Sequence, residues 1–432
     1  MSAALYLFIA AAAMAWLAWK QMTPLPKLEV PRVQFEGDNS MERYISETKS
    51  LMDQGYAQYL KKGEPFSIRN PSDERHPLVI LPMKYLAEVR NAPQSKLSFP
   101  YFLDKLFARI AARVMVGPEL CRNEEWLQLA LSYTEASMKA IRGVRARYPP
   151  SLRFLAQYID SNTRTVLRHR RHAAQVLRPL LEVRMSEKEE STYIDGIKWL
   201  LDVYEMRGKN LSPDQLAQDE FILNVASISS SSAVALSIIY DMIDHPELLE
   251  EIREEISRVV KMHTTWTQNS LGELRILDSF MKESLRLHTL QQLTVQRTAM
   301  VPWTFKDGFQ LPAGTNISFA SQQLNLDNDV YPNATTFDAK RFLRKREEID
   351  PNRFHFASVS DDSIVFGAGF HACPGRFLAQ DILKLMFVQL LTRYDFKLAQ
   401  HDQSRPPDIP YNFSIMPNMA SQILLKEKSN ML

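Results

Sequence analysis

The chain contains, at residues 366–376, the stretch FGAGFHACPGR, which places Cys373 in a glycine-rich loop ahead of an apolar helical run, residues 377–391. Backbone N–H groups at the start of a helix favour a thiolate, and glycines let the backbone approach the sulfur closely. A single thiolate in such a loop suits one open coordination position, as on a haem iron with an axial cysteine. A lone cysteine can instead be a small buried hydrophobe. The surrounding glycine, histidine, proline and arginine residues favour the metal ligand.

Two shorter motifs precede this loop. ESLR at residues 283–286 places Glu283 and Arg286 on one helix face, where they can pair. FDAKRF at residues 337–342 contains Arg341. A glutamate–arginine pair at this spacing is common on protein surfaces, so the pair alone does not indicate a function. The order of the three motifs along the chain is the informative feature.

With these motifs the chain resembles the cytochrome P-450 family of haem-thiolate monooxygenases. The family loop F-x-x-G-x-x-x-C-x-G is matched at Phe366, Gly369, Cys373 and Gly375. The other two motifs match the family's E-x-x-R helix and its later arginine segment. The resemblance runs from about residue 30 to the C-terminus and is closest to fungal microsomal members that oxidise terpenoids and related secondary metabolites.

The resemblance implies a haem b cofactor and its protein contacts. Cys373 is the iron ligand, and Phe366 and Gly369 belong to the cofactor-binding loop. His371 and Arg297 are assigned to the haem propionates, because two buried carboxylates need cationic donors. A zinc site at His371 and Cys373 is the alternative, but it lacks two further ligands.

The resemblance also implies a structural role for Glu283, Arg286 and Arg341. In the family these three side chains are buried together and lock the core around the haem loop. The role needs a planar bidentate guanidinium, so lysine should not replace Arg341.

A serine run marks a long helix that is predicted from a capping box at Ser212 to about Met242. Serine hydroxyls in a helix can bond back to the preceding turn, so residues 229–232 can form a polar groove or a contact between small residues. The resemblance aligns the run with the family's A/G-G-x-D/E-T motif over the haem. Ser230 then replaces the oxygen-activating threonine and Ser229 replaces the acid. Both are catalytic candidates, with proton delivery through water and serine hydroxyls.

Residues 97–113 depart from the family pattern. LSFPYFL at residues 97–103 runs almost directly into FARIAAR at residues 107–113, which resembles the family's E-helix region. We therefore expect an internal deletion near residues 101–107 that removes the B–C loop, the C helix and the D helix. The family's W-x-x-x-R segment, which binds a haem propionate, does not occur before Trp126. The predicted consequences are a solvent-exposed haem and weak haem retention.

Composition limits the other possibilities. The chain has 432 residues, 45% of them hydrophobic, and a net charge of +2, which does not suggest a nucleic-acid partner. No glycine-rich dinucleotide or P-loop motif occurs. Two cysteines, Cys121 and Cys373, cannot form a disulfide framework, so a reducing compartment is expected. RHRRH at residues 168–172 is either a solvated helix face or a contact with anionic lipid or a reductase.

The N-terminus predicts a membrane anchor. The uncharged run from Ala3 to Trp19 would reach about 26 Å as a helix, enough for a thin bilayer such as the endoplasmic reticulum. A cleaved signal peptide, the alternative, would need positive charge before the run. Lys20 and Lys27 follow it instead, which places the remaining chain on the cytoplasmic side. Residues 1–22 are thus expected to be a single-pass anchor with its flank, and residues 23–432 a catalytic domain.

The helical patterning predicts a mainly α fold with small β-sheets, as the family resemblance implies. The expected activity is oxidation of an apolar small molecule with O2 and electrons from an NADPH-dependent cytochrome P-450 reductase. Two alternatives remain. The serines at residues 229–230 are compatible with a haem-thiolate isomerase or dehydratase, which needs no reductase. The missing segment is compatible with a haem-deficient, non-catalytic relic.

Overall fold

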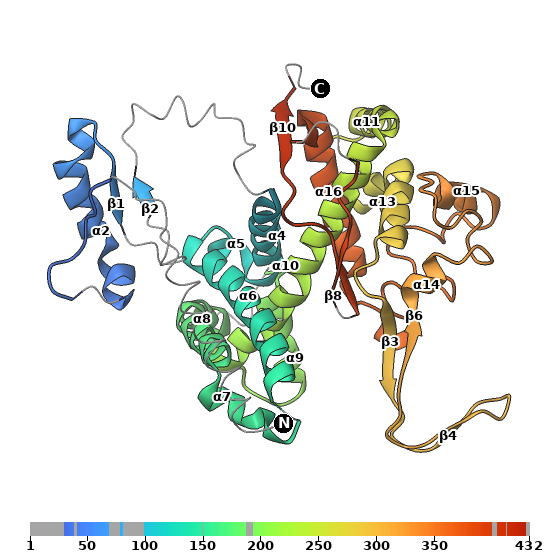
Figure 1. Ribbon diagram of the computed structural model, residues 1–432, viewed down its shortest axis with the longest axis horizontal. Helices are drawn as coiled ribbons and strands as arrows, with labels where there is room; N and C mark the ends of the chain where they lie inside the picture. Colours follow the sequence, from blue (N-terminus) through green and yellow to red (C-terminus); the bar gives the residue numbers. More distant parts are fainter. Residues whose placement is uncertain are drawn as a thin grey trace, which may run out of the picture. The chain divides into compact units, whose positions relative to one another are not determined.

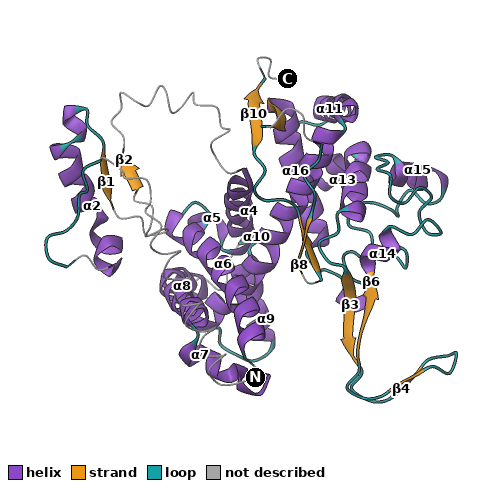
Figure 2. Cartoon of the chain, in the orientation of Figure 1, coloured by secondary structure: helices purple, strands orange, loops and turns teal. Residues whose placement is uncertain are grey.

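The structure is a computed structural model that describes residues 30–38, 41–68, 78–80, 99–148, 150–186, 193–399, 404–411 and 413–428 (Figures 1 and 2). The chain divides into two compact units, Met1–Pro93 and Gln94–Leu432, each considered by itself. The predicted anchor at residues 1–22 lies outside the described residues.

In the described part of the first unit, an α-helix packs on a small sheet. It comprises α2 (Met41–Gln58), η1 (Leu60–Lys62), β1 (Phe66–Ile68) and β2 (Leu78–Ile80), and the two strands pair antiparallel. Gly55 on α2 faces the Phe66 ring, where an added Cβ would lie 2.3 Å from a ring carbon. The close packing of α2 on β1 therefore requires glycine at this position.

The second unit is built around α10 (Pro213–Asp244). Ser212 caps this helix by accepting a hydrogen bond from the Gln215 N–H at 3.2 Å, as the capping box predicts. Of the described helices, only α10 is long and apolar enough to cross a membrane, and 56% of that apolar segment is buried inside the protein. We interpret it as the core helix of the unit.

Helices surround α10 along most of its length (Figure 1). Those preceding it are α4 (Phe99–Met115), α5 (Gly117–Leu120), α6 (Glu124–Arg147), η4 (Pro150–Leu155), α7 (Ala156–Ile159), α8 (Ser161–Ser186) and α9 (Gly196–Met206). Those following it are α11 (Pro246–Met262), α12 (Gln268–Gly272), α13 (Arg275–Leu287), α14 (Ser321–Asn325), α15 (Arg341–Glu348), η5 (Gly369–His371) and α16 (Arg376–Arg393). Helices α4, α6, α8, α13 and α16 all contact α10.

The strands described in the second unit form four two-stranded antiparallel pairs. They are β3 (Leu293–Thr298) with β6 (Asn316–Ala320), β4 (Trp303–Thr304) with β5 (Gln310–Leu311), β7 (Tyr394–Leu398) with β10 (Ile423–Glu427), and β8 (Ile409–Tyr411) with β9 (Ser414–Met416). This arrangement confirms the predicted mainly α fold with small sheets (Figure 2).

Helix α4 covers the place where the family pattern breaks. Residues 99–115 form one helix, so the two pieces assigned to separate family regions are successive turns of it. Leu103, Phe107 and Ala111 recur every fourth residue and are buried, which gives α4 the apolar face that it packs against α10.

Candidate functional site

Cys373 lies in a loop whose backbone is held by its own hydrogen bonds. The Cys373 N–H donates to the Phe366 carbonyl at 2.7 Å, and the Gly367 N–H donates to the Ile364 carbonyl at 2.9 Å. Gly367 has a φ of 82°, and an added Cβ would lie 3.2 Å from the His371 carbonyl oxygen, so glycine permits this fold of the loop. The loop leads directly into α16, at Arg376.

The outer surface of this loop is open. Cys373 is a free, exposed cysteine, and an added Cβ at Gly369 or Gly375 would meet nothing within 4 Å. Phe366 points inward and packs edge-on against Phe356 at 5.5 Å between ring centroids. The loop thus presents one free thiol at an exposed surface. This donor set fits a planar group with one axial thiolate ligand, namely haem.

Glu283 and Arg286 form a buried bidentate pair on α13. Arg286 Nε and Nη2 donate to the two Glu283 carboxylate oxygens at 2.9 and 2.7 Å. Glu283 is fully buried and Arg286 is 3% exposed. A buried charge pair is stable only when its remaining donors and acceptors also find partners.

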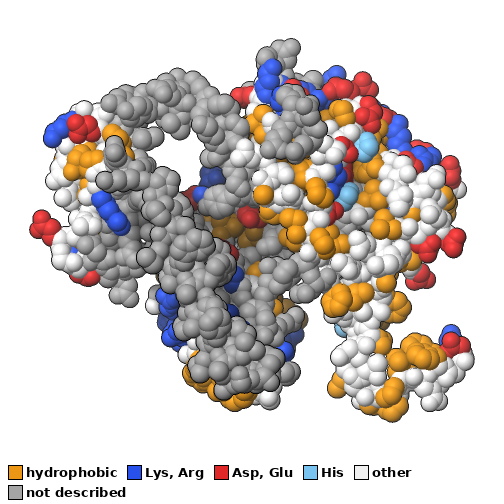
Figure 3. All heavy atoms as spheres, viewed as in Figure 1, with side chains coloured by type: hydrophobic (Ala, Val, Ile, Leu, Met, Phe, Trp, Pro, Cys, Tyr) orange, Lys and Arg blue, Asp and Glu red, His pale blue; other side chains and the backbone are white. Residues whose placement is uncertain are grey.

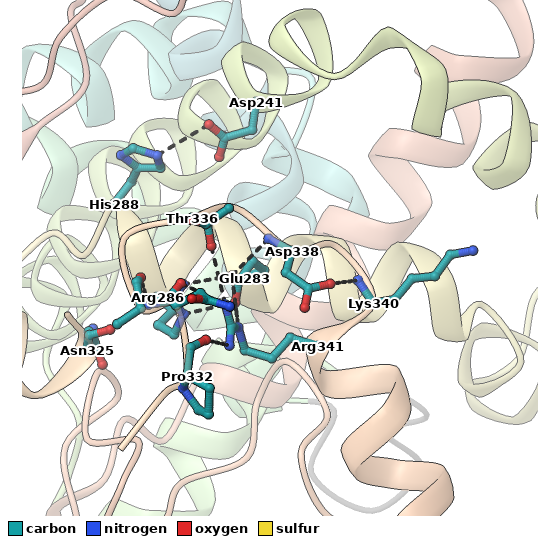
Figure 4. A network of polar contacts seen from close by, with 12 residues as sticks. Asp241, Glu283, Arg286, His288, Asn325, Pro332, Thr336, Asp338, Lys340 and Arg341 are labelled. Carbon is teal, nitrogen blue, oxygen red and sulfur yellow. Dashed lines mark hydrogen bonds and ion pairs between the residues drawn. The ribbon is translucent and has the colours of Figure 1, made fainter. Parts of the chain in front are cut away.

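Arg341 supplies those partners from a distant segment (Figure 4). Its Nε donates to the Glu283 carboxylate at 3.1 Å, and its Nη1 donates to the Pro332 carbonyl at 2.7 Å. Arg286 Nη1 donates to the Ala334 carbonyl at 2.6 Å. The predicted lock of Glu283, Arg286 and Arg341 is therefore confirmed, and it fixes the chain between α14 and α15 against α13.

A second buried network joins α10 to α13. His288, at the end of α13, contacts the Asp408 carboxylate through Nδ1 at 2.6 Å and the Asp241 carboxylate through Nε2 at 3.3 Å. Arg405 donates to Asp241 at 2.6 Å and to Asp408 at 3.1 Å. Burial by itself lowers the pKa of His288, but the hydrogen bonds to the two carboxylates raise it overall. Sequence reasoning missed this network, because no local motif links residues so far apart.

The remaining predicted residues lie on three other segments. Arg297 is half-buried on β3 and donates to the Gln296 carbonyl at 2.8 Å. His371 is exposed on η5, and Ser229 and Ser230 lie on α10. Within the described residues, no hydrogen bond or ion pair joins any of them to Cys373.

Serine hydroxyls of α10 bond back to the preceding turn, as their residue type predicts. Ser230 Oγ donates to the Ala226 carbonyl at 2.6 Å, and Ser227 Oγ donates to the Leu223 carbonyl at 2.8 Å. Ser230 is exposed, on the side of α10 that also carries the exposed Ile222. Its hydroxyl proton is therefore bound to the backbone, while its lone pairs remain available to accept a hydrogen bond.

An unpaired carboxyl on α10 was also missed. Glu220 is fully buried, and both of its carboxylate oxygens lack a hydrogen-bond partner in the part of the chain that the structure describes. Burial, with the nearby Asp195 and Asp219 carboxylates, raises the pKa of Glu220 well above its usual value. No motif pointed to it, since its position follows from the packing of α9 and α4 on α10.

Comparisons with known proteins identify the family of the chain. The family model described as cytochrome P-450 matches residues 83–424. The chain is 36% identical, over 471 aligned positions, to the cytochrome P-450 monooxygenase cheE of Chaetomium globosum, covering 93% of this chain and 91% of that protein. It is 33% identical, over 472 positions, to the pyrichalasin C-7 hydroxylase of Pyricularia grisea, covering 93% and 92%.

A solved structure shares the fold. Retinoic acid bound cyanobacterial CYP120A1 superposes with a TM-score of 0.60 at 19% sequence identity, covering 80% of this chain and 72% of that one. The family model matches most of the chain, and relatives above 30% identity align along nearly its whole length. These two findings decide the assignment. The chain belongs to the cytochrome P-450 family of monooxygenases.

Proposed function

We propose that the chain is a haem-thiolate monooxygenase that hydroxylates or otherwise oxidises an apolar small molecule, such as a terpenoid or another secondary metabolite. The observation that carries the proposal is the loop before α16, where the exposed free thiol of Cys373 stands on a backbone held by its own hydrogen bonds. The relative named as a hydroxylase supports the reaction type. O2 is the co-substrate, and an NADPH–cytochrome P-450 reductase is the proposed electron donor.

The proposal gives each residue of the loop a role toward haem b. Cys373 Sγ would ligate the haem iron, and Phe366 and Gly369 would shape the loop that receives the haem. His371 and Arg297 pair with the propionates, because a charge-assisted hydrogen bond compensates a carboxylate that leaves water. When bound, the haem supplies the activation of O2, and the protein supplies orientation and the exclusion of water.

Ser230 and Ser229 are the proposed proton-relay residues. Ser230 Oγ donates to the Ala226 carbonyl and can at the same time accept a hydrogen bond from water. The hydroxyl can therefore hold a water molecule on the exposed side of α10, in place of the family's threonine. Ser229 has no carboxylate to offer, so water must carry the proton that the family's acid would carry.

The internal deletion near residues 101–107 is part of the proposal. The alignment with cheE extends over 471 positions, more than the 432 residues of this whole chain, so that relative has internal residues without a counterpart here. The continuity of α4 across residues 99–115 supports a junction at this place. The segment proposed to be absent comprises the B–C loop and the C and D helices.

The proposed organisation is a membrane anchor with its flank at residues 1–22 and a catalytic domain at residues 23–432. The apolar run from Ala3 to Trp19 supports the anchor, and the fungal relatives support an endoplasmic-reticulum enzyme. The catalytic domain would then face the cytoplasm as a single-pass protein.

The test is the carbon-monoxide difference spectrum of the reduced protein. Cys373→Ser should abolish the spectrum typical of thiolate-ligated haem, because the other cysteine of the chain, Cys121, is buried elsewhere in the fold. Cys121→Ser is the matched control: Cys121 is buried, and its Sγ contacts the Pro118 carbonyl at 3.4 Å. A thiolate spectrum that survives in Cys373→Ser would disprove the ligand assignment.

Turnover and haem content of the same purified protein distinguish two alternative functions. Turnover without NADPH would favour the isomerase or dehydratase that Ser229 and Ser230 suggest. A wild-type chain that binds no haem, even when haem is supplied, would favour the non-catalytic relic that the deletion suggests.

A further inference from the structure

A cavity of about 210 Å³ lies beside the start of α16. Its wall comes mainly from α13, from residues 352–363 and from the first residues of α16. The cavity has room for about seven water molecules at about 30 Å³ each. It is smaller than the roughly 300–1,000 Å³ of sites for drug-sized ligands. The proposed haem chemistry uses none of the residues that line it.

The cavity is lined by three cationic side chains, which are Lys282, Arg353 and Arg376. Among the residues that the structure describes, no carboxylate lies within ion-pair distance of any of the three. The acid in the lining, Asp362, already has partners: it contacts Lys345 at 3.7 Å and accepts a hydrogen bond from Ser360. The cavity is therefore positively charged without compensation, which favours an anionic occupant.

Two donors at the cavity wall are buried without a partner. Ser358 Oγ and Arg376 Nε make no hydrogen bond to any described residue. Lys282 Nζ donates to the Ser358 carbonyl at 3.1 Å and lies 3.5 Å from Ser363 Oγ. An ammonium has three donors, so Lys282 can bond a further acceptor. Buried donors without partners are unfavourable, and the cavity therefore favours an occupant that accepts hydrogen bonds.

The outer surface of the same region differs from the cavity. Figure 3 shows Lys and Arg side chains beside Asp and Glu side chains over α11 and α15. The pairs of Arg344 with Asp338 and of Lys340 with Glu251 belong to this surface. Basic groups are compensated there by neighbouring acids, whereas those of the cavity are not.

The protonation of the cavity wall responds to this environment. Burial lowers the pKa of Lys282 to about 8, although the Asp278 and Asp362 carboxylates raise it, and the Lys345 ammonium lowers it further. Burial also lowers the pKa of His355, so its imidazole adds no charge at neutral pH. An anion in the cavity would favour the charged form of Lys282, because a nearby opposite charge raises the pKa of an ammonium.

We propose that this cavity binds a small phosphate-type anion, either inorganic phosphate or a phosphate monoester. The forked donors of Arg353 and Arg376 match phosphate oxygens, and Lys282 supplies a point charge. With the Ser358 hydroxyl, these donors come from three segments, which suits the three acceptor oxygens of a phosphate better than the two of a carboxylate. Arg376 Nη1 also donates to the Cys373 carbonyl at 2.8 Å. The bound anion would thus link α13 to the loop that carries the free thiol.

This proposal does not depend on the proposed haem chemistry. It is tested by titrating the full-length protein with inorganic phosphate and with glycerol phosphate, in chloride at constant ionic strength, and measuring binding by calorimetry. We expect saturable binding at one site and an unfolding temperature that rises with ligand concentration, because the anion binds only the folded chain. Acetate should bind roughly tenfold more weakly, since it offers fewer acceptors. The tighter of the two phosphates identifies the class of the ligand.

Two variants locate the bound anion. Lys282→Met should raise the dissociation constant for phosphate roughly 10- to 100-fold, through the loss of a buried charge-assisted hydrogen bond. Arg353 is exposed, so Arg353→Gln should raise it roughly fivefold and keeps the test decisive if Lys282→Met does not fold. Arg393→Gln removes the same charge from the other end of α16, where the side chain is exposed, and should bind phosphate like the wild type.

Chemical labelling reports on the cavity directly. Acetic anhydride modifies neutral amines, so at about pH 8 a large fraction of Lys282 is in the reactive form. Phosphate should slow the modification of Lys282 several-fold, measured by mass spectrometry, because it occupies the cavity and favours the ammonium. Lys261, which is exposed near the end of α11, should be modified at the same rate with and without phosphate.

Three outcomes would overturn the proposal. Phosphate could stabilise the protein no more than chloride does at the same ionic strength. Lys282→Met and Arg353→Gln could both bind phosphate as tightly as the wild type, which would place the anion elsewhere. Acetate could bind as tightly as phosphate, which would make the cavity a general anion site without preference for phosphate.

Discussion

Arg341 is the side chain on which the buried Glu283 network depends. It bonds the Glu283 carboxylate and also the backbone carbonyls of Pro332, Asn333 and Thr336. A planar guanidinium can reach all four because its donors are arranged as a fixed fork, whereas an ammonium is a point charge with three rotatable donors. The geometry of one functional group thus holds the loop before α15 in place.

We expect Arg341→Lys to lower the free energy of unfolding by on the order of 3 kcal/mol, because buried carbonyls and part of a buried carboxylate lose their donors. Arg344→Lys is the control, since Arg344 is half-exposed and pairs with Asp338 at the surface; its effect should stay within about 0.5 kcal/mol. Urea unfolding followed by circular dichroism measures both. Equal effects would show that the network does not need the guanidinium.

Three segments meet at His288. Asp241 lies in the last part of α10, His288 caps α13, and Asp408 immediately precedes β8. Arg405 bonds both carboxylates and keeps them from repelling one another. A protonated imidazole also suits the end of α13, where the helix dipole is negative.

This network predicts a pH dependence of stability. The folded-state pKa of His288 is raised above its usual value of 6.5, so its contribution is fully present below about pH 6.5 and is lost as the pH rises through the folded-state pKa. Between about pH 6 and pH 8.5, the free energy of unfolding should fall more for the wild type than for His288→Gln. His263→Gln, at the partly exposed end of α11, should follow the wild-type profile. If the profiles of His288→Gln and the wild type were parallel, protonation of His288 would not contribute to the stability of the fold.

The proposed deletion would affect how completely the whole protein covers its haem. Ile222 is 55% and Leu223 is 38% exposed on α10, on the helix that carries Ser229 and Ser230. We expect these apolar side chains to be covered in relatives that contain the segment proposed to be absent here. Without that segment, one propionate of a bound haem would also lose the arginine of the family's W-x-x-x-R segment.

We therefore expect the purified chain to contain less than one haem per molecule. Each lost charge-assisted bond costs on the order of 1.5–3 kcal/mol, or roughly a factor of 10 to 100 in retention. Inserting the corresponding segment of cheE near residues 101–107 should restore the haem content, measured as the ratio of haem to protein absorbance. A glycine–serine insert of equal length should not. A full complement of haem in the unmodified chain would mean that His371 and Arg297 suffice.

The amino-acid sequence by itself determined the features that depend on neighbouring residues. The loop around Cys373, the start of α10 at Ser212 and the pairing of Glu283 with Arg286 each follow from spacing within a few residues. The backbone has few allowed conformations, so side-chain chemistry at fixed offsets is enough to predict these local structures. The resemblance to the family rested on the same motifs.

Only the tertiary structure decided which distant groups meet. It placed Asp408 beside His288, and it buried the Glu220 carboxylate where none of the described residues hydrogen-bonds it. It also turned Arg170 of α8 toward Gln218 of α10, whereas Arg168 of the same basic cluster is exposed. The path of the chain sets these contacts, and it depends on how whole helices bury their apolar faces against α10. Periodicity along the sequence reports that a face is apolar, but not which other segment covers it.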